Sequence, residues 1–300
     1  MSNISLKRLM RDYKNLSKPL LEEKGIYTKV NDDNLYEAYA LIIGPKDTPY
    51  SNGFYFFKFN FCKKYPLSPP KVIFMTLNEK VRFNPNLYVE GKVCLSILGT
   101  WSGPSWTSCM NFETILVSLQ SLLNDKPIQN EPGYENENGI LMERYNILLT
   151  YYNIKVAVLD MLNNPPKDFE YFIPFMKKEF YKRYHEYVDE IKKSLLPITD
   201  NLITLKMYGM CAMIRPHSLL KNLEEYHNLH KNDIDEINTT DDSNIKKESI
   251  VNKIKRKCPK ESANDFNIGT IKTGLDNKEW IVKEIKSGKR WFPKKDITIS

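Results

Sequence analysis

The first stretch of the chain has the apolar spacing of an α-helix. Its apolar residues stand three or four positions apart, at Leu6, Leu9, Met10, Tyr13 and Leu16. This spacing predicts an amphipathic helix over 6–16. The opposite face is basic and is formed by Lys7, Arg8, Arg11 and Lys14. Two interpretations stay open for this face: a solvated helix surface, or a docking surface for an acidic partner.

The pattern then changes to the two-residue period of β-strands. In the run FYFFKFNF, for example, Phe57 and Phe59 share one face, and Lys58 and Asn60 share the other. Short connections separate the strands, which is typical of an antiparallel meander. The predicted strands are 26–30, 36–43, 54–61 and 71–76.

Helical spacing returns after a long stretch at 77–110 that has little secondary-structure signal. A loop of this length inside a domain is often functional, and this one carries Cys, Trp and Pro. Prolines separate the helices that follow. The predicted helices are 111–123, 139–162, 171–195 and one after Pro216.

The end of the chain changes character twice. Residues 231–265 are polar with almost no aromatic side chains, which predicts a linker. Residues 266–300 contain two turn-like segments between short strands. We therefore predict an α+β core with an antiparallel four-stranded meander over 1–155, a helical extension over 156–230, the linker at 231–265, and a small β-rich module over 266–300.

The composition is that of a globular protein. Hydrophobic residues make up 41% and charged residues 27% of the 300 positions, which excludes wholesale disorder. The net charge of +7 comes from scattered basic residues, so we do not expect nucleic-acid binding. We also expect no membrane span and no secretory signal, and hence a cytoplasmic protein. The basic run at 253–260 is either a charged linker or a nuclear address.

The five cysteines contain no C-x-x-C pair, which opposes a zinc ribbon, and their odd number opposes a disulfide framework. Cys94 lies in the long loop, so we expect it to be exposed, as a nucleophile must be. Cys109 is the other candidate for the nucleophile. Cys62 follows a Phe-rich strand and Cys211 lies in GMCAM, so both are expected in the packed interior.

Three segments resemble one known family, in the same order along the chain. The run FNPNLYVEGKVCLSILGTW at 83–101 resembles the active-site segment of ubiquitin-conjugating enzymes, in which His-Pro-Asn precedes a Gly and then the catalytic Cys-Leu. GPKDTPYSNGFY at 44–55 and YPLSPPKV at 65–72 resemble two loops of that family. The resemblance covers about 1–155 and extends less sharply to large members with a C-terminal helical region. The tail, 266–300, weakly resembles ends of giant DNA virus proteins, which would place the protein in a host-cell cytoplasm.

The resemblance implies a role for each matching residue. Cys94 would be the nucleophile that carries ubiquitin, or a ubiquitin-like modifier, as a thioester. Asn86 would either donate to the oxyanion or pin the loop. Asn130 matches the gate residue that receives the attacking lysine. Asn84 stands where the family usually has His, which puts the rigidity of the loop in doubt.

The resemblance also implies partners: the modifier, an activating enzyme, a ligase and a protein substrate. The basic helix face, formed by Lys7, Arg8, Arg11 and Lys14, would meet the activating enzyme, and Leu67, Pro104 and Trp106 would meet the ligase. No metal or organic cofactor is implied. Two alternatives stay open. One is a catalytically silent ubiquitin-binding scaffold of the same fold, and the other is a cysteine hydrolase, which would need a His beside the thiol.

Overall fold

The computed structural model describes residues 2–16, 19–231, 261, 263–274, 278–285 and 288–293. The chain divides into two compact units, Met1–Asp242 and Ser243–Ser300. Most of the predicted linker lies outside the described residues, as do the basic run at 253–260 and Cys258. Within the described ranges, no helix has both the length and the apolar character needed to cross a membrane.

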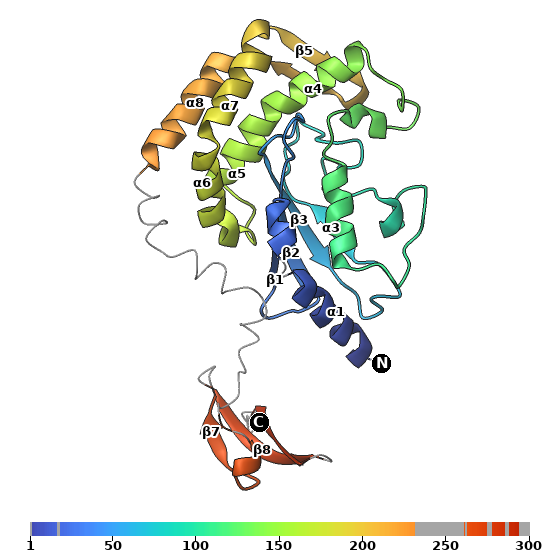
Figure 1. The fold of residues 1–300 in the computed structure, drawn as a ribbon, viewed down its shortest axis with the longest axis vertical. Helices are drawn as coiled ribbons and strands as arrows, with labels where there is room; N and C mark the ends of the chain where they lie inside the picture. The colour runs from blue at the N-terminus through green and yellow to red at the C-terminus, as the bar shows by residue number, and fades with distance from the viewer. Residues whose placement is uncertain are drawn as a thin grey trace, which may run out of the picture. The chain divides into compact units, whose positions relative to one another are not determined.

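The first unit is built around an antiparallel sheet (Figure 1). Its strands follow the chain order, β1-β2-β3-β4, so the predicted meander is confirmed. The register between the two central strands pairs Leu41 with Phe56. The strands are β1 (Ile26–Val30), β2 (Glu37–Ile43), β3 (Phe54–Asn60) and β4 (Lys71–Phe74).

One face of this sheet is covered by helices that the sequence predicted. Phe59 of β3 contacts Phe112 of α3 (Phe112–Ser121), with the ring centroids 4.7 Å apart. Tyr13 of α1 (Ser2–Leu16) contacts Phe112 at 6.0 Å. A short helix, α2 (Pro19–Glu23), leads into β1. The start of α3 is fixed by a capping box between Asn111 and Thr114.

The other face of the sheet is covered by the C-terminal extension. Phe56 of β3 contacts Phe169, with ring centroids 4.6 Å apart. Tyr27 of β1 contacts Phe175 of α6 (Ile173–Lys182) at 3.8 Å. Figure 1 shows α3 and α6 on opposite sides of the sheet. Both faces are therefore covered, and on the second face Phe54 and Phe56 are buried while Lys58 and Asn60, the predicted polar positions, are half-buried.

The helices of the extension are shorter than predicted. A π-helical stretch interrupts the first at Asn153, whose side chain turns into the core and accepts a hydrogen bond from Tyr55 Oη at 2.6 Å. Arg183 leaves helical geometry and separates the next two helices. The segments are α4 (Ile140–Tyr152), η3 (Asn153–Asp160), α5 (Met161–Asn163), η4 (Glu170–Phe172), α6, α7 (Tyr184–Glu190), η5 (Ile191–Leu195) and α8 (Pro216–Leu229).

The extension also contains a β-hairpin that the sequence did not predict. Strand β5 (Leu202–Leu205) pairs with β6 (Met210–Met213), and the turn η7 (Lys206–Tyr208) connects them. Each strand is four residues long, too short for its alternation to stand out from the helical patterns on either side. Burial alternates along β6 and leaves Cys211 exposed, so its predicted burial is wrong.

The second unit contains a three-stranded antiparallel sheet of β7 (Ile271–Thr273), β8 (Glu279–Ile285) and β9 (Gly288–Pro293). Its buried cluster consists of Ala263, Val282 and Trp291. The Trp291 indole N–H donates to the Glu261 carbonyl at 3.0 Å. This small core lies entirely within the unit.

Each unit has its own core, so removal of the second should leave the first folded. We expect a chain that ends at Asp242 to melt within about 3 °C of the full-length protein in circular dichroism at 222 nm, which corresponds to less than about 1 kcal/mol. A truncated chain that is insoluble, or that melts more than about 10 °C lower, would contradict this boundary.

Candidate active site

Cys94 and Asn86 are joined by two hydrogen bonds. The Cys94 backbone N–H donates to the Asn86 carbonyl, and the Asn86 side-chain Nδ2 donates to the Cys94 carbonyl, both at 2.8 Å. An isolated β-bridge between Leu87 and Val93 closes the loop between them. The two residues that the sequence selected therefore lie together.

A glycine permits the tight turn of this loop. Gly91 has φ +90°, and a Cβ there would come within 2.9 Å of the Phe74 carbonyl oxygen. The Phe74 N–H donates to the Gly91 carbonyl at 2.9 Å, which holds the turn against the end of β4. Only glycine takes this conformation at so close an approach without strain.

Cys94 is buried, with 1% of its surface exposed, so the predicted exposure is wrong. A short helical turn at Ser96–Leu98 follows it. Thr100 Oγ1 donates to the Val93 carbonyl at 2.8 Å and accepts from the Leu95 N–H at 3.0 Å, which ties the turn to both neighbours of Cys94. Sequence reasoning missed Thr100, because a threonine in a polar loop carries no distinctive signal.

Asn84 holds the loop between Asn86 and Cys94 through hydrogen bonds of its side chain. Its Nδ2 donates to the Leu122 carbonyl at 2.7 Å and to Tyr50 Oη at 3.1 Å, and its Oδ1 accepts from the Asn86 N–H at 3.0 Å. Tyr50 Oη in turn donates to the Phe83 carbonyl at 2.6 Å. The side chain is fully buried, where unpaired amide groups would be costly. The doubt about rigidity that followed from the missing His is thus answered by an amide with three close partners.

The Asn130 side chain lies next to Asn84 and to the Leu122 carbonyl. Its Nδ2 lies 3.4 Å from the Leu122 carbonyl and 3.5 Å from Asn84 Oδ1, which are long hydrogen bonds. The amide is thus shared between two partners inside the loop network. Its role as a gate stays a prediction.

The other cysteines and the histidines are placed differently from Cys94. Cys109 and Cys62 are exposed, so the predicted burial of Cys62 is wrong: it lies two residues beyond the end of β3. All four histidines are in α7, in α8 or directly after α8. In the described ranges, no group of three or more His, Cys, Asp or Glu side chains could hold a metal ion.

Comparisons with known proteins identify the family. The family model described as ubiquitin-conjugating enzyme matches residues 8–146, a segment that contains Cys94, Asn86 and Asn130. Ubiquitin-conjugating enzyme E2 Z of Xenopus tropicalis is 39% identical over 188 residues, covering 62% of this chain and 59% of the relative. The human protein of that name is 40% identical over 184 residues, covering 61% and 51%. This chain belongs to the ubiquitin-conjugating enzyme family.

Two further proteins resemble this chain, one over a longer part of the chain and one over a shorter part. A probable ubiquitin-conjugating enzyme of Acanthamoeba polyphaga mimivirus is 37% identical over 224 residues, covering 67% of this chain and 15% of the relative. The solved structure of human ubiquitin-conjugating enzyme E2 G1 is 36% identical, with a TM-score of 0.35, and the match covers 41% of this chain and 96% of that one. The chain spans about half the length of the curated E2 Z relatives it matches.

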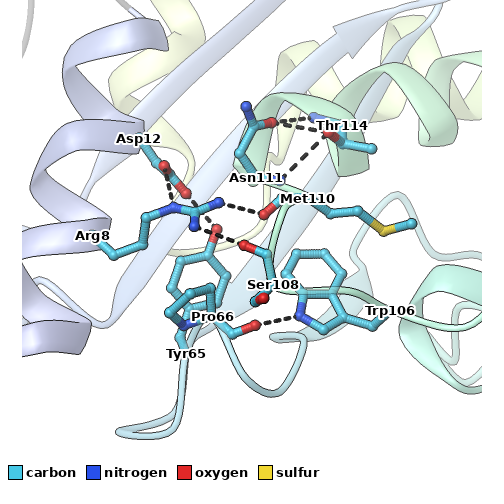
Figure 2. A network of polar contacts seen from close by, with 9 residues as sticks. All are labelled: Arg8, Asp12, Tyr65, Pro66, Trp106, Ser108, Met110, Asn111 and Thr114. Carbon is cyan, nitrogen blue, oxygen red and sulfur yellow. Dashed lines mark hydrogen bonds and ion pairs between the residues drawn. The ribbon is translucent and has the colours of Figure 1, made fainter.

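The surface expected to meet an activating enzyme differs from the prediction in one residue. Lys7, Arg11 and Lys14 are exposed on α1. Arg8 instead turns inward, where Nε pairs with Asp12 at 2.9 Å and the two terminal nitrogens donate to the carbonyls of Ser108 and Met110 at 2.8 and 2.5 Å. Figure 2 shows this guanidinium at the centre of the network. Arg8 is therefore a connection between α1 and the segment before α3.

The two predicted ligase loops lie side by side. The Trp106 indole N–H donates to the Pro66 carbonyl at 2.6 Å, and the Trp106 ring centroid is 5.9 Å from that of Tyr65 (Figure 2). Leu67 is 79% exposed and Pro104 is exposed as well. An exposed apolar residue beside an anchored aromatic is typical of protein-binding surfaces, so the ligase contact stays a prediction that this geometry favours.

Removal of Arg8 should destabilise the protein. Its ion pair with Asp12 is buried, with side-chain exposures of 12% and 3%, and loss of one partner leaves the carboxylate with Tyr65 Oη as its remaining partner. We expect Arg8→Ala to lower the free energy of unfolding by about 3 kcal/mol in urea titrations. Arg11→Ala, one turn along on the exposed side, is the matched control and should change it by less than about 0.5 kcal/mol. Equal stability of the two variants would contradict the network.

Proposed function

We propose that the protein is an active ubiquitin-conjugating enzyme that carries ubiquitin, or a ubiquitin-like modifier, on Cys94. The observation that carries the proposal is the pair of hydrogen bonds between Asn86 and Cys94, inside the segment that matches the family. An amide beside a cysteine is suited to acyl transfer, because its N–H groups can donate to the oxyanion that forms at the thioester carbon.

The reaction has two steps. In the first, the Cys94 thiolate attacks the carbonyl carbon of the modifier thioester on the activating enzyme, and a C–S bond to Cys94 forms as the donor thiolate leaves. In the second, a neutral lysine amine attacks the same carbon. A C–N bond forms, the C–S bond breaks, Cys94 leaves as a thiolate, and the surplus proton on nitrogen goes to solvent. Because only 1% of Cys94 is exposed, the surroundings of its thiol must open for charging.

One observation favours an alternative. The burial of Cys94 is what a catalytically silent, ubiquitin-binding member of the family would have. Such a protein would bind ubiquitin without forming a thioester. The cysteine hydrolase has no comparable support, because no histidine is in the loop at 82–100.

The nature of the adduct tests the proposal. With activating enzyme, ATP and ubiquitin, the wild-type chain should form an adduct that reductant removes on a gel. Cys94→Ser should form a reductant-resistant oxyester and Cys94→Ala none. Cys109→Ala, which alters an exposed thiol, should charge normally. Absence of an adduct with retained ubiquitin binding would establish the silent scaffold, and loss of the adduct in Cys109→Ala alone would move the nucleophile to Cys109.

Substitution of Asn86 separates its two roles. In Asn86→Ala the Cys94 carbonyl loses its side-chain donor, so we expect slower charging. Discharge of pre-charged protein onto free lysine should slow by a further factor of about 10², because attack by an amine, a weaker nucleophile than a thiolate, depends more on the oxyanion donor. Single-turnover gels measure both steps, and thermal melting checks the fold. Equal slowing of the two steps would show that Asn86 only holds the loop and does not donate to the oxyanion.

A further inference from the structure

Tyr208 of the C-terminal extension contacts two segments that flank the site. Its Oη donates to Glu131 Oε2 at 2.7 Å, and Glu131 directly follows Asn130. The Arg82 guanidinium lies over the Tyr208 ring, 4.7 Å from its centroid, at the start of the loop that carries Asn84 and Asn86. One side chain from η7 thus joins the segments around 82 and 131.

Arg82 is held by rings and a carbonyl. Its guanidinium is also 3.8 Å from the Tyr88 ring centroid, and a terminal nitrogen donates to the Pro85 carbonyl at 2.5 Å. The Arg82 carbonyl accepts from Tyr145 Oη at 2.7 Å. Within the part of the chain that the structure describes, no ion pair joins Arg82 to Glu131, and Tyr208 contacts both side chains.

Tyr208 is suited to act as a permanent donor. Burial, followed by its hydrogen bond to Glu131, raises the pKa of Tyr208 far above its usual range. The phenol therefore stays protonated at neutral pH and acts as a donor to Glu131. It fixes one oxygen of a half-buried carboxylate and leaves the second oxygen to another donor.

We propose that Tyr208 is a positioning residue for amine transfer, which holds the Glu131 carboxylate beside the active-site loop for the incoming lysine. This inference rests on the proposed function. The chain of contacts runs from Glu131 through its neighbour Asn130 to Asn84, and from Asn84 through Asn86 to the Cys94 carbonyl.

The chemistry of the second step explains why a fixed carboxylate matters there. A lysine arrives as an ammonium and must lose one proton before it attacks and another afterwards. A carboxylate attracts the ammonium and accepts a hydrogen bond from it, whereas a thiol acceptor brings no positive charge. Loss of the Tyr208 hydroxyl should thus affect an amine acceptor more than a thiol acceptor.

The experiment compares these acceptors with the full chain charged with ubiquitin on Cys94. The variants are Tyr208→Phe, Glu131→Gln and the double variant. Tyr181→Phe is the matched control, because its Oη makes a hydrogen bond of equal length, 2.7 Å, to the His227 carbonyl within the extension. Single-turnover discharge is measured with free lysine and with 2-mercaptoethanesulfonate, and melting temperatures are measured in parallel.

We expect Tyr208→Phe and Glu131→Gln each to slow discharge onto lysine by roughly tenfold, the effect of one hydrogen bond. Discharge onto the thiol should change by less than about twofold, and the double variant should be no slower than the slower single variant. Tyr181→Phe should match the wild type with both acceptors.

Unchanged lysine discharge in Tyr208→Phe would overturn the inference. Equal slowing with both acceptors would also overturn it, because a general weakening of the fold gives that result. An additive double variant would show that Tyr208 does not act through Glu131. Failure of the wild-type chain to charge is a separate outcome: it refutes the proposed function itself, and the role of Tyr208 with it.

Discussion

The structure depends on a sheet that buries aromatic side chains on both of its faces. Phe59 of β3 points to α3 and Phe56 to the extension, so neither face could be left in water without a large hydrophobic cost. The extension therefore completes the core of the first unit. Packing of the extension against the sheet also places its hairpin near the loop at 82–88. There Tyr208 contacts Arg82 of the loop and Glu131 of the segment after α3. The same burial thus stabilises the fold and brings a distant segment to the site.

Buried amides build the active-site loop. Asn84 and Asn86 supply hydrogen bonds between segments without placing a charge in the interior, which would be costly. This arrangement holds the Cys94 backbone in place, and the cysteine itself is buried. The site is thus fixed around the carbonyl of the cysteine, while burial of the residue limits access to its thiol.

The partner surfaces are connected to each other through Arg8. Its guanidinium joins α1, where an activating enzyme is expected, to the carbonyls of Ser108 and Met110, a few residues beyond Trp106. The same network includes Asp12 and Tyr65, which directly precedes the Pro66-Leu67 loop. The basic helix face and the apolar loops thus rest on one cluster of polar contacts, which is buried at Asp12 and Tyr65 and exposed at Ser108.

The sequence by itself determined the first helix, the four-stranded meander and the helix that follows the long loop, because a two-residue or 3.6-residue period sets which side chains share a face. The resemblance to a known family selected Asn86 and Cys94, which the structure places in hydrogen-bond contact. Only the tertiary structure decided that Cys94 is buried, that Cys62 and Cys211 are exposed, and that Arg8 turns inward. It also decided that Tyr208 meets Glu131, 77 positions earlier. Such contacts depend on how whole elements pack, and periodicity along a single segment carries no information about the partner that will cover it.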